Sequence, residues 1–127
     1  MPIRTLLVDD FASIRKSLRK LLKTVPGVEV VGEAEDCRIA LELMHKLLPD
    51  IIIMDIRMPI MDGIEATRWI TNVYPGVKVI AFTSCAEKNT IRQMFEAGAS
   101  GILLKGCGSV EIISAIKAVD GGNNYEQ

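Results

Sequence analysis

Short apolar runs alternate along the chain with longer stretches in which apolar residues recur every three or four positions. The short runs are rich in β-branched residues and bounded by proline or glycine, which is typical of buried strands. The longer stretches have the periodicity of helices with one apolar face. We therefore predict strands at 3–9, 28–34, 51–55, 77–82 and 101–104, and helices at 11–25, 36–47, 63–74, 87–97 and 109–120.

The predicted helix boundaries coincide with residues that favour caps and turns. Pro26 and Gly27 end the first helix, and Asp36 and Ser109 can cap the N-termini of the second and the last. Gly98 is a candidate C-terminal cap for the fourth helix. The core-facing stripe predicted for the first helix is Phe11, Ile14, Leu18, Leu21, Leu22 and Val25, with most of its basic residues on the opposite face.

Five strands alternating with five helices indicate the α/β class with a parallel sheet. The crossovers are expected to be right-handed, with helices on both faces, which describes a doubly wound (βα)5 domain. We predict a single domain over residues 1–120. The polar, Gly/Asn-rich segment 121–127 is expected to be a simple terminus or the start of a linker.

The composition is that of an ordinary globular protein: 127 residues, 49% apolar and 24% charged, suit one domain with one core. A formal net charge of −1 creates no field toward nucleic acid or an anionic membrane. The sequence has no apolar run of the roughly 18 residues that a membrane span requires, and it starts without a signal peptide. Three cysteines without metal-ligand spacing are expected to be reduced thiols, so we expect a cytoplasmic protein.

Polar side chains stand at the predicted carboxyl ends of four strands. Asp9 and Asp10 end the first strand, Asp55 the third, Thr83 the fourth and Lys105 the fifth. In a doubly wound sheet the carboxyl ends of the strands form the functional edge. We therefore expect these side chains to converge on a single site.

The chemistry of this set points to a metal and a phosphoryl group. Three carboxylates in one cleft repel one another, and a bound cation would remove the cost of ionising all of them. Oxygen ligands without nearby His or Cys favour Mg²⁺ over Zn²⁺. With Mg²⁺ and Lys105 balancing the charge, Asp55 could attack a phosphoryl group as a nucleophile. The same two cations would stabilise charge on the transferred group, and the Thr83 hydroxyl could donate to one of its oxygens.

Together these motifs resemble the receiver domain of two-component response regulators. Each motif is weak alone, but all four occur in order at the ends of successive strands, and the match spans nearly the whole chain. The resemblance implies a flavodoxin-like fold with a five-stranded sheet of order 2-1-3-4-5. The matching segments are Val8-Asp9-Asp10, Asp55-Ile56-Arg57-Met58-Pro59-x-Met61-Asp62-Gly63, Thr83-Ser84 and Leu104-Lys105.

The resemblance gives three residues a role with the phosphoryl group. Asp55 would be the phospho-acceptor, Thr83 the switch hydroxyl, and Lys105 the ion-pair partner of Asp55 and then of the phosphate. Two positions depart from the family pattern: Ile102 stands at the switch position where many receivers have an aromatic residue, and Gly106 stands where many have proline. A cis X-Pro bond is thereby excluded, and the conformational freedom of Gly106 allows the loop another route to its geometry.

The resemblance also implies a metal site and partners. Mg²⁺ would be held by Asp55, by Asp10 directly, by Asp9 largely through water, and by the backbone carbonyl of Arg57. Such a domain is not an enzyme, apart from catalysing its own Mg²⁺-dependent phosphorylation and dephosphorylation. The expected partners are a sensor histidine kinase and a second copy in a homodimer, formed through the last two helices or through the first and last.

The segment 101–105, together with a last helix that ends Ala-Val-Asp-Gly-Gly, resembles a particular group of receivers. In this group, the NarL/LuxR type, the receiver precedes a helix-turn-helix DNA-binding domain, which is absent from this chain. The resemblance implies transcription regulation through such a C-terminal domain. We expect the receiver itself to bind neither nucleic acid nor a membrane.

Other interpretations of the same residues stay open. A stand-alone or phosphate-independent receiver-like scaffold would bind partners without chemistry at Asp55. Asp9 and Asp10 could cap the first helix as well as bind metal, and the basic face of that helix could be solvated or could dock a kinase. A flavin carrier of the same fold would need a Ser/Thr/Gly-rich loop after the first strand, where this chain has acidic residues. A hydrolase would need a substrate pocket, and none is evident.

Overall fold

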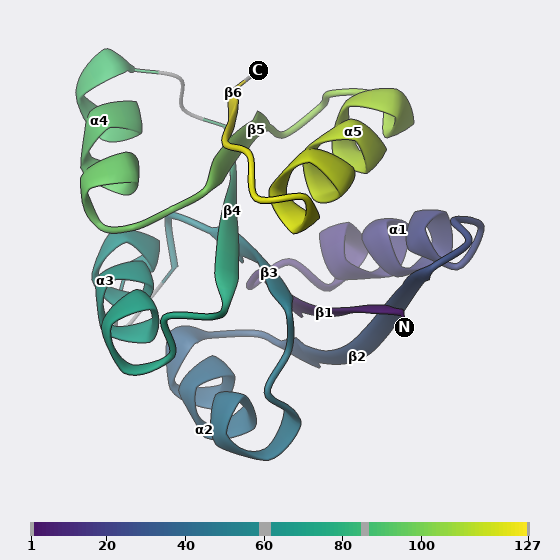
Figure 1. Cartoon of the computed structure of the whole chain (residues 1–127), viewed down its shortest axis with the longest axis horizontal. Helices are drawn as coiled ribbons and strands as arrows, with labels where there is room; N and C mark the ends of the chain where they lie inside the picture. The colour runs from purple at the N-terminus through teal and green to yellow at the C-terminus, as the bar shows by residue number, and fades with distance from the viewer. Residues whose placement is uncertain (1, 59–61, 85–86, 127) are drawn as a thin grey trace.

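The chain folds as alternating strands and helices around one sheet, as the periodicity predicts (Figure 1). The structure is a computed structural model that describes residues 2–58, 62–84 and 87–126. Pro59 and Met61 of the Asp55 motif lie outside these ranges. The strands are β1 (Ile3–Val8), β2 (Val28–Ala34), β3 (Ile51–Asp55), β4 (Lys78–Thr83), β5 (Gly101–Leu104) and β6 (Tyr125–Glu126). The helices are α1 (Ala12–Leu22), α2 (Cys37–Leu47), α3 (Gly63–Val73), α4 (Lys88–Glu96) and α5 (Ser109–Asp120).

The described residues form a parallel sheet of six strands in the order β2-β1-β3-β4-β5-β6. The predicted order 2-1-3-4-5 is present, but the expectation of five strands was incomplete, because Tyr125–Glu126 adds a sixth beside β5. Gly101 leaves room for it: a Cβ atom there would lie 3.2 Å from the Tyr125 carbonyl oxygen. The Tyr125 hydroxyl also donates a hydrogen bond of 2.5 Å to Glu111 on α5. These contacts fix Tyr125 and Glu126 against the domain, where a simple polar terminus would have no such contacts.

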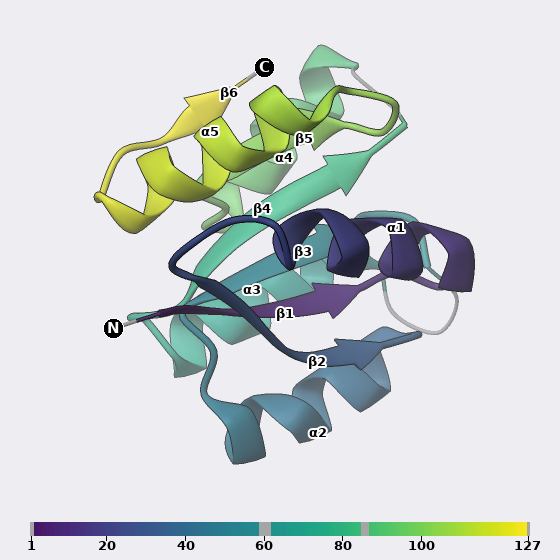
Figure 2. The same cartoon turned by 90° about the vertical axis from the view of Figure 1, so that its right-hand side faces the viewer.

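Helices cover both faces of the sheet (Figures 1 and 2). Side chains alternate between the two faces along each strand, so Leu7 packs with α1 and α5 while its neighbours Leu6 and Val8 pack with α2 and α3. Every residue of β3 is buried, which is why its sequence is a continuous apolar run up to Asp55. In the ranges that the structure covers, none of the helices is long and apolar enough to cross a membrane.

The helix ends confirm part of the capping prediction and correct the rest. Asp36 caps α2, its carboxylate accepting from the Ile39 amide at 2.9 Å, and Gly98 follows α4 with a φ of 109°. Ser109 is not a cap, because α5 begins with it and Gly108 occupies the N-cap position. Phe11 does not belong to the core-facing stripe either: it precedes α1 as the N-cap residue and is 59% exposed.

Candidate functional site

The polar residues predicted to converge are brought together at one edge of the sheet. In the sheet register, Val8 lies beside Met54, Asp55 beside Phe82, and Thr83 beside Leu104. The residues that end or follow β1, β3, β4 and β5 therefore meet at the carboxyl edge. Because every strand pair is parallel, no side chain has to reach across the sheet to join the site.

Asp9, Asp10 and Asp55 form an acidic cluster in which each residue offers a carboxylate oxygen within 4.8 Å of the others. Asp9 and Asp55 are buried, with 2% and 4% of their surface exposed, while Asp10 is exposed. Asp9 continues β1, its amide donating to the Ala34 carbonyl at 3.0 Å, and its carboxylate accepts from the Phe11 amide at 2.9 Å. The cluster thus has two carboxylates in a low-dielectric setting and one open to water.

Burial and the neighbouring Asp9 charge raise the pKa of Asp55 from 3.8 to about 6. Two interactions oppose this rise: the charge of Lys105 lowers the pKa, and so does the hydrogen bond of 3.2 Å from the Arg57 amide to the Asp55 carboxylate. At pH 7 about nine-tenths of Asp55 is therefore ionised. The carboxylate is available as a nucleophile, and its burial leaves the charge poorly solvated.

Lys105 is the cation of the site. Its ammonium lies 2.8 Å from the Asp9 carboxylate and 3.4 Å from that of Asp55, so it bridges the two buried acids and is closer to Asp9. Burial pulls the pKa of Lys105 down, but the hydrogen bond to Asp9 and the charge of Asp55 outweigh burial and raise it above the ordinary value. The exposed Phe11 ring lies over this lysine, with its centroid 5.5 Å from Nζ.

Thr83 ends β4, is 2% exposed, and accepts a backbone hydrogen bond of 2.7 Å from the Lys105 amide. The predicted switch residue and the predicted counter-ion are therefore joined through the backbone of adjacent strands. Arg57 lies just beyond β3, and its amide contacts Asp55. Its carbonyl as a metal ligand stays a prediction.

Two residues of the Asp55 motif have structural roles that the sequence analysis did not assign. Asp62 caps α3, its carboxylate accepting from the Glu65 amide at 2.9 Å. Gly63 begins α3 directly against the end of β3, where a Cβ atom would lie 2.4 Å from the Asp55 carbonyl oxygen. The Gly63 amide donates to the Ile56 carbonyl at 2.7 Å. Glycine is required at this position because the two backbones touch, and this contact fixes the backbone that carries Asp55.

A hard cation suits the acidic cluster. Its donors are all carboxylate oxygens, the set that Mg²⁺ prefers, and the exposed Asp10 leaves one side open to water and phosphate oxygens. Asp9 and Asp55 are brought together although Lys105 neutralises only part of their charge. Mg²⁺ held by the carboxylates of this cluster would relieve the remaining repulsion.

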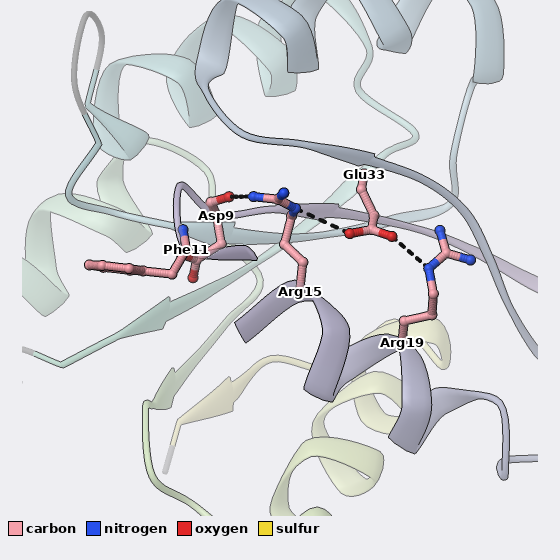
Figure 3. Close-up of polar contacts among 5 residues, drawn as sticks. All are labelled: Asp9, Phe11, Arg15, Arg19 and Glu33. Carbon is pink, nitrogen blue, oxygen red and sulfur yellow. Dashed lines mark hydrogen bonds and ion pairs between the residues drawn. The ribbon is translucent and has the colours of Figure 1, made fainter. Parts of the chain in front are cut away.

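A chain of ion pairs behind Asp9 was not predicted from the sequence (Figure 3). Arg15 donates to the Asp9 carbonyl at 2.5 Å and to Glu33 on β2 at 3.1 Å, and Arg19 holds the other Glu33 oxygen at 2.6 Å. The periodicity of α1 predicts only that most of its basic residues, which include both arginines, lie opposite the core-facing stripe. The available signal was the position of Glu33, a charged residue one place before the end of a largely apolar strand.

A family model of the response regulator receiver domain matches residues 5–117. The chain belongs to this family. As a receiver domain it is 41% identical over 120 residues to the transcriptional regulatory protein LiaR of Bacillus subtilis, and 37% identical over 123 residues to the response regulator GacA of Pseudomonas viridiflava. The match with LiaR covers 94% of this chain and 57% of LiaR, and the match with GacA covers 97% of this chain and 58% of GacA.

The fold of the receiver domain is also very similar to that of a solved relative. A two-component response regulator of the LuxR family from Aurantimonas superposes with a TM-score of 0.93 at 36% identity, over 98% of this chain and 89% of the other. The matched relatives place the receiver domain in the NarL/LuxR group. Receiver domains are signalling domains that bind Mg²⁺ at an acidic pocket, which is the role that the cluster at the carboxyl edge suits.

The two departures from the family pattern lie beside the site of this receiver domain. Ile102 is 2% exposed and packs with Met94 and Ala99, so the switch position holds a buried aliphatic side chain. Gly106 has a φ of 95°, a conformation that proline cannot adopt and that other residues rarely adopt. The loop after Lys105 therefore uses the conformational freedom of glycine, as predicted.

Proposed function

We propose that the chain is a phosphorylation switch, in which Asp55 receives a phosphoryl group from a sensor histidine kinase. The observation that carries the proposal is the placement of Asp55: a buried, largely ionised carboxylate within reach of Lys105 and of two further carboxylates. Burying a charged carboxylate in this setting lowers the stability of the fold, and buried charges of this kind, at the open edge of a sheet, are typical of functional sites.

In the proposed transfer, a carboxylate oxygen of Asp55 forms a bond to phosphorus and the phosphorus–nitrogen bond of the phosphohistidine breaks. The electron pair remains on the imidazole nitrogen, and the product is an acyl phosphate on Asp55. Asp55 has to be deprotonated to react, which a pKa of about 6 allows at neutral pH.

Other residues of the site would bind the transferred group. Lys105 can exchange its contact with the Asp55 carboxylate for a phosphoryl oxygen without moving far, since it lies 3.4 Å from that carboxylate now. Thr83, on the adjacent strand, would donate its hydroxyl to another oxygen. Mg²⁺ held by Asp9, Asp10, Asp55 and the Arg57 carbonyl would supply positive charge beside the phosphoryl oxygens.

We further propose that in a longer regulator this domain controls DNA binding and transcription through a helix-turn-helix domain. The relatives support this, because LiaR is a transcriptional regulatory protein and the chain spans 57% of its length. Residues 1–120 would act as the receiver and 121–127 would begin the connection to such a domain. A homodimer is the assembly expected for a regulator of this type.

The test is incubation with acetyl phosphate and Mg²⁺, followed by mass spectrometry of the intact chain. We expect one phosphoryl adduct that is stable in acid, labile to hydroxylamine, absent without Mg²⁺, and absent from Asp55→Asn. Asp120→Asn, which alters an exposed aspartate at the end of α5, is the control and should be phosphorylated like the unmodified chain. An unmodified chain that takes up no phosphoryl group, or an adduct that persists in Asp55→Asn, would contradict the proposal.

The second candidate is a scaffold that binds partners without phosphate, and the buried Ile102 favours it, because this residue has no polar end to change the surface. The two candidates differ in one measurable property. If phosphorylation at Asp55 changes neither the affinity for the kinase nor self-association, the scaffold describes the chain better.

A further inference from the structure

The backbone between the two acids of the β1–α1 loop is held by a side chain from the helix that follows. The guanidinium of Arg15, in the first turn of α1, points back over the loop and donates through Nη1 to the Asp9 carbonyl oxygen at 2.5 Å (Figure 3). That carbonyl belongs to the peptide unit joining Asp9 to Asp10. Because the unit is planar, fixing its oxygen also fixes the direction in which Asp10 leaves Asp9.

The Arg15 side chain is itself held in place. Its Nε donates to Glu33 Oε1 at 3.1 Å, and Arg19 Nε lies 2.6 Å from Glu33 Oε2, so both carboxylate oxygens of Glu33 are engaged. The side chains of Arg15 and Glu33 are only 16% and 30% exposed. Glu33 is thus contacted by two arginines, one at each carboxylate oxygen, and its pair with Arg15 is much less exposed than an ion pair on a solvated helix face.

Asp9 is fixed on its other sides as well. Its amide donates to the Ala34 carbonyl on β2 at 3.0 Å, and its carboxylate accepts from the Phe11 amide at 2.9 Å and contacts Lys105 at 2.8 Å. The Asp9 carbonyl is the remaining polar group of this residue, and Arg15 takes it. Asp10, in contrast, is exposed, so its placement depends on the backbone that precedes it.

We infer that Arg15 is a positioning residue for the Mg²⁺ site, and that Glu33 and Arg19 hold Arg15 in the required orientation. The inference rests on the proposed Mg²⁺-dependent phosphorylation of Asp55. Arg15 acts through the peptide unit between Asp9 and Asp10 and touches neither the metal nor the phosphoryl group. Partners that orient metal ligands from behind affect metal affinity by about 10- to 100-fold when they are removed.

The experiment measures the initial rate of Asp55 phosphorylation by acetyl phosphate over a range of Mg²⁺ concentrations. Each variant gives a half-saturating Mg²⁺ concentration and a plateau rate. For Arg15→Gln we expect the half-saturating concentration to rise about tenfold and the plateau rate to stay within about twofold of the unmodified chain. Arg15→Lys keeps the charge but places its donors on a single nitrogen, so it cannot reproduce both contacts of the guanidinium. Glu33→Gln keeps an acceptor but lacks the charge, so both variants should lie in between.

Arg38→Gln is the matched control. It also breaks an arginine–glutamate pair, at 3.3 Å, but this pair lies on the exposed surface of α2 and should leave both kinetic quantities unchanged. A merely structural role for Arg15 predicts a loss of folded protein and of plateau rate with an unchanged half-saturating concentration, and that result overturns the inference. If Arg15→Gln does not fold, Arg15→Lys is judged by the same criterion. Failure of the unmodified chain to be phosphorylated would contradict the proposed function instead.

Discussion

Replacing Asp55 with asparagine removes a negative charge that the fold buries beside Asp9. In the metal-free protein the pKa of Asp55 is raised from 3.8 to about 6, so ionisation of this carboxyl opposes folding. Below about pH 3 the group is protonated in both the folded and the unfolded chain, and the penalty is absent. The penalty grows as the pH rises from about 3 through 6 and is essentially complete above pH 7.

The size of the penalty follows from the shift: each pKa unit is about 1.4 kcal/mol, so the full effect is about 3 kcal/mol. This is an upper value, because Asp9 and Lys105 readjust when the Asp55 charge is removed. The asparagine side chain would keep an oxygen that accepts from the Arg57 amide, so the pH-dependent part of the change reports the charge. For a domain of this size the difference corresponds to a rise in Tm on the order of 10 °C at pH 8.

The assay is urea denaturation, followed by circular dichroism, of the unmodified chain and of Asp55→Asn from pH 4 to pH 8 without Mg²⁺. The stability advantage of Asp55→Asn should increase by about 2.5 kcal/mol from pH 4 to pH 8, because a small part of the penalty is already present at pH 4. Added Mg²⁺ should reduce this advantage by stabilising the unmodified chain. Glu42→Gln alters a carboxylate whose side chain is 63% exposed and serves as the control, because an exposed charge contributes little to stability and its removal should have a small effect throughout. An Asp55→Asn advantage that is equal at pH 4 and pH 8 would refute the reasoning.

Three further results are expected. Gly63→Ala should destabilise the fold by about 1–3 kcal/mol in urea and slow phosphorylation, because the new Cβ would lie 2.4 Å from the Asp55 carbonyl oxygen, whereas Gly76→Ala meets no atom within 4 Å and should do neither. Mg²⁺ affinity measured by calorimetry should fall about tenfold from pH 7 to pH 5, because binding requires ionised Asp55, and an affinity that does not change over this range would exclude that carboxylate as a ligand. Tyr125→Phe removes the hydrogen bond to Glu111, so the backbone amide of residue 125 should exchange its hydrogen roughly fivefold faster than in the unmodified chain. Unchanged exchange would mean that β6 does not depend on this bond.

The carboxyl edge could be predicted from the sequence because its signals are local. A buried parallel strand is a continuous apolar run, so the polar residue that ends it, such as Asp55 or Lys105, marks where the chain reaches the surface of the sheet. Parallel topology then does the rest, since it brings all such ends to the same side. In the structure, the three aspartates and Lys105 lie within reach of one another, as the positions of the strand ends predict.

Features that depend on contacts between distant segments were not predicted. Strand β6 is two residues long, which is too short to show a periodicity in the sequence. The small Gly101 leaves room for it beside β5, and it is anchored by the hydrogen bond from Tyr125 to Glu111, which is 14 residues earlier in the chain. Arg15 looks like any other charge on a basic helix until Glu33 is placed beside it by the pairing of β1 with β2. In both cases the decisive information is which side chains the fold brings together.

The burial of Ile102 decides how a signal could leave the site. Ile102 pairs with Ala81 on β4 and with Glu126 on β6, and it packs against Met94 of α4. An isoleucine has no hydrogen-bonding group to expose, so its rotation alone cannot change the chemistry of the surface. A shift of β4 near Thr83 would instead change the packing of α4 and the pairing of β6. The structure describes all of α4, and Met94 is its one buried residue. Strand β6 has only two residues. Moving either element should therefore cost little free energy. We therefore expect phosphorylation to be read at the edge formed by α4 and β6.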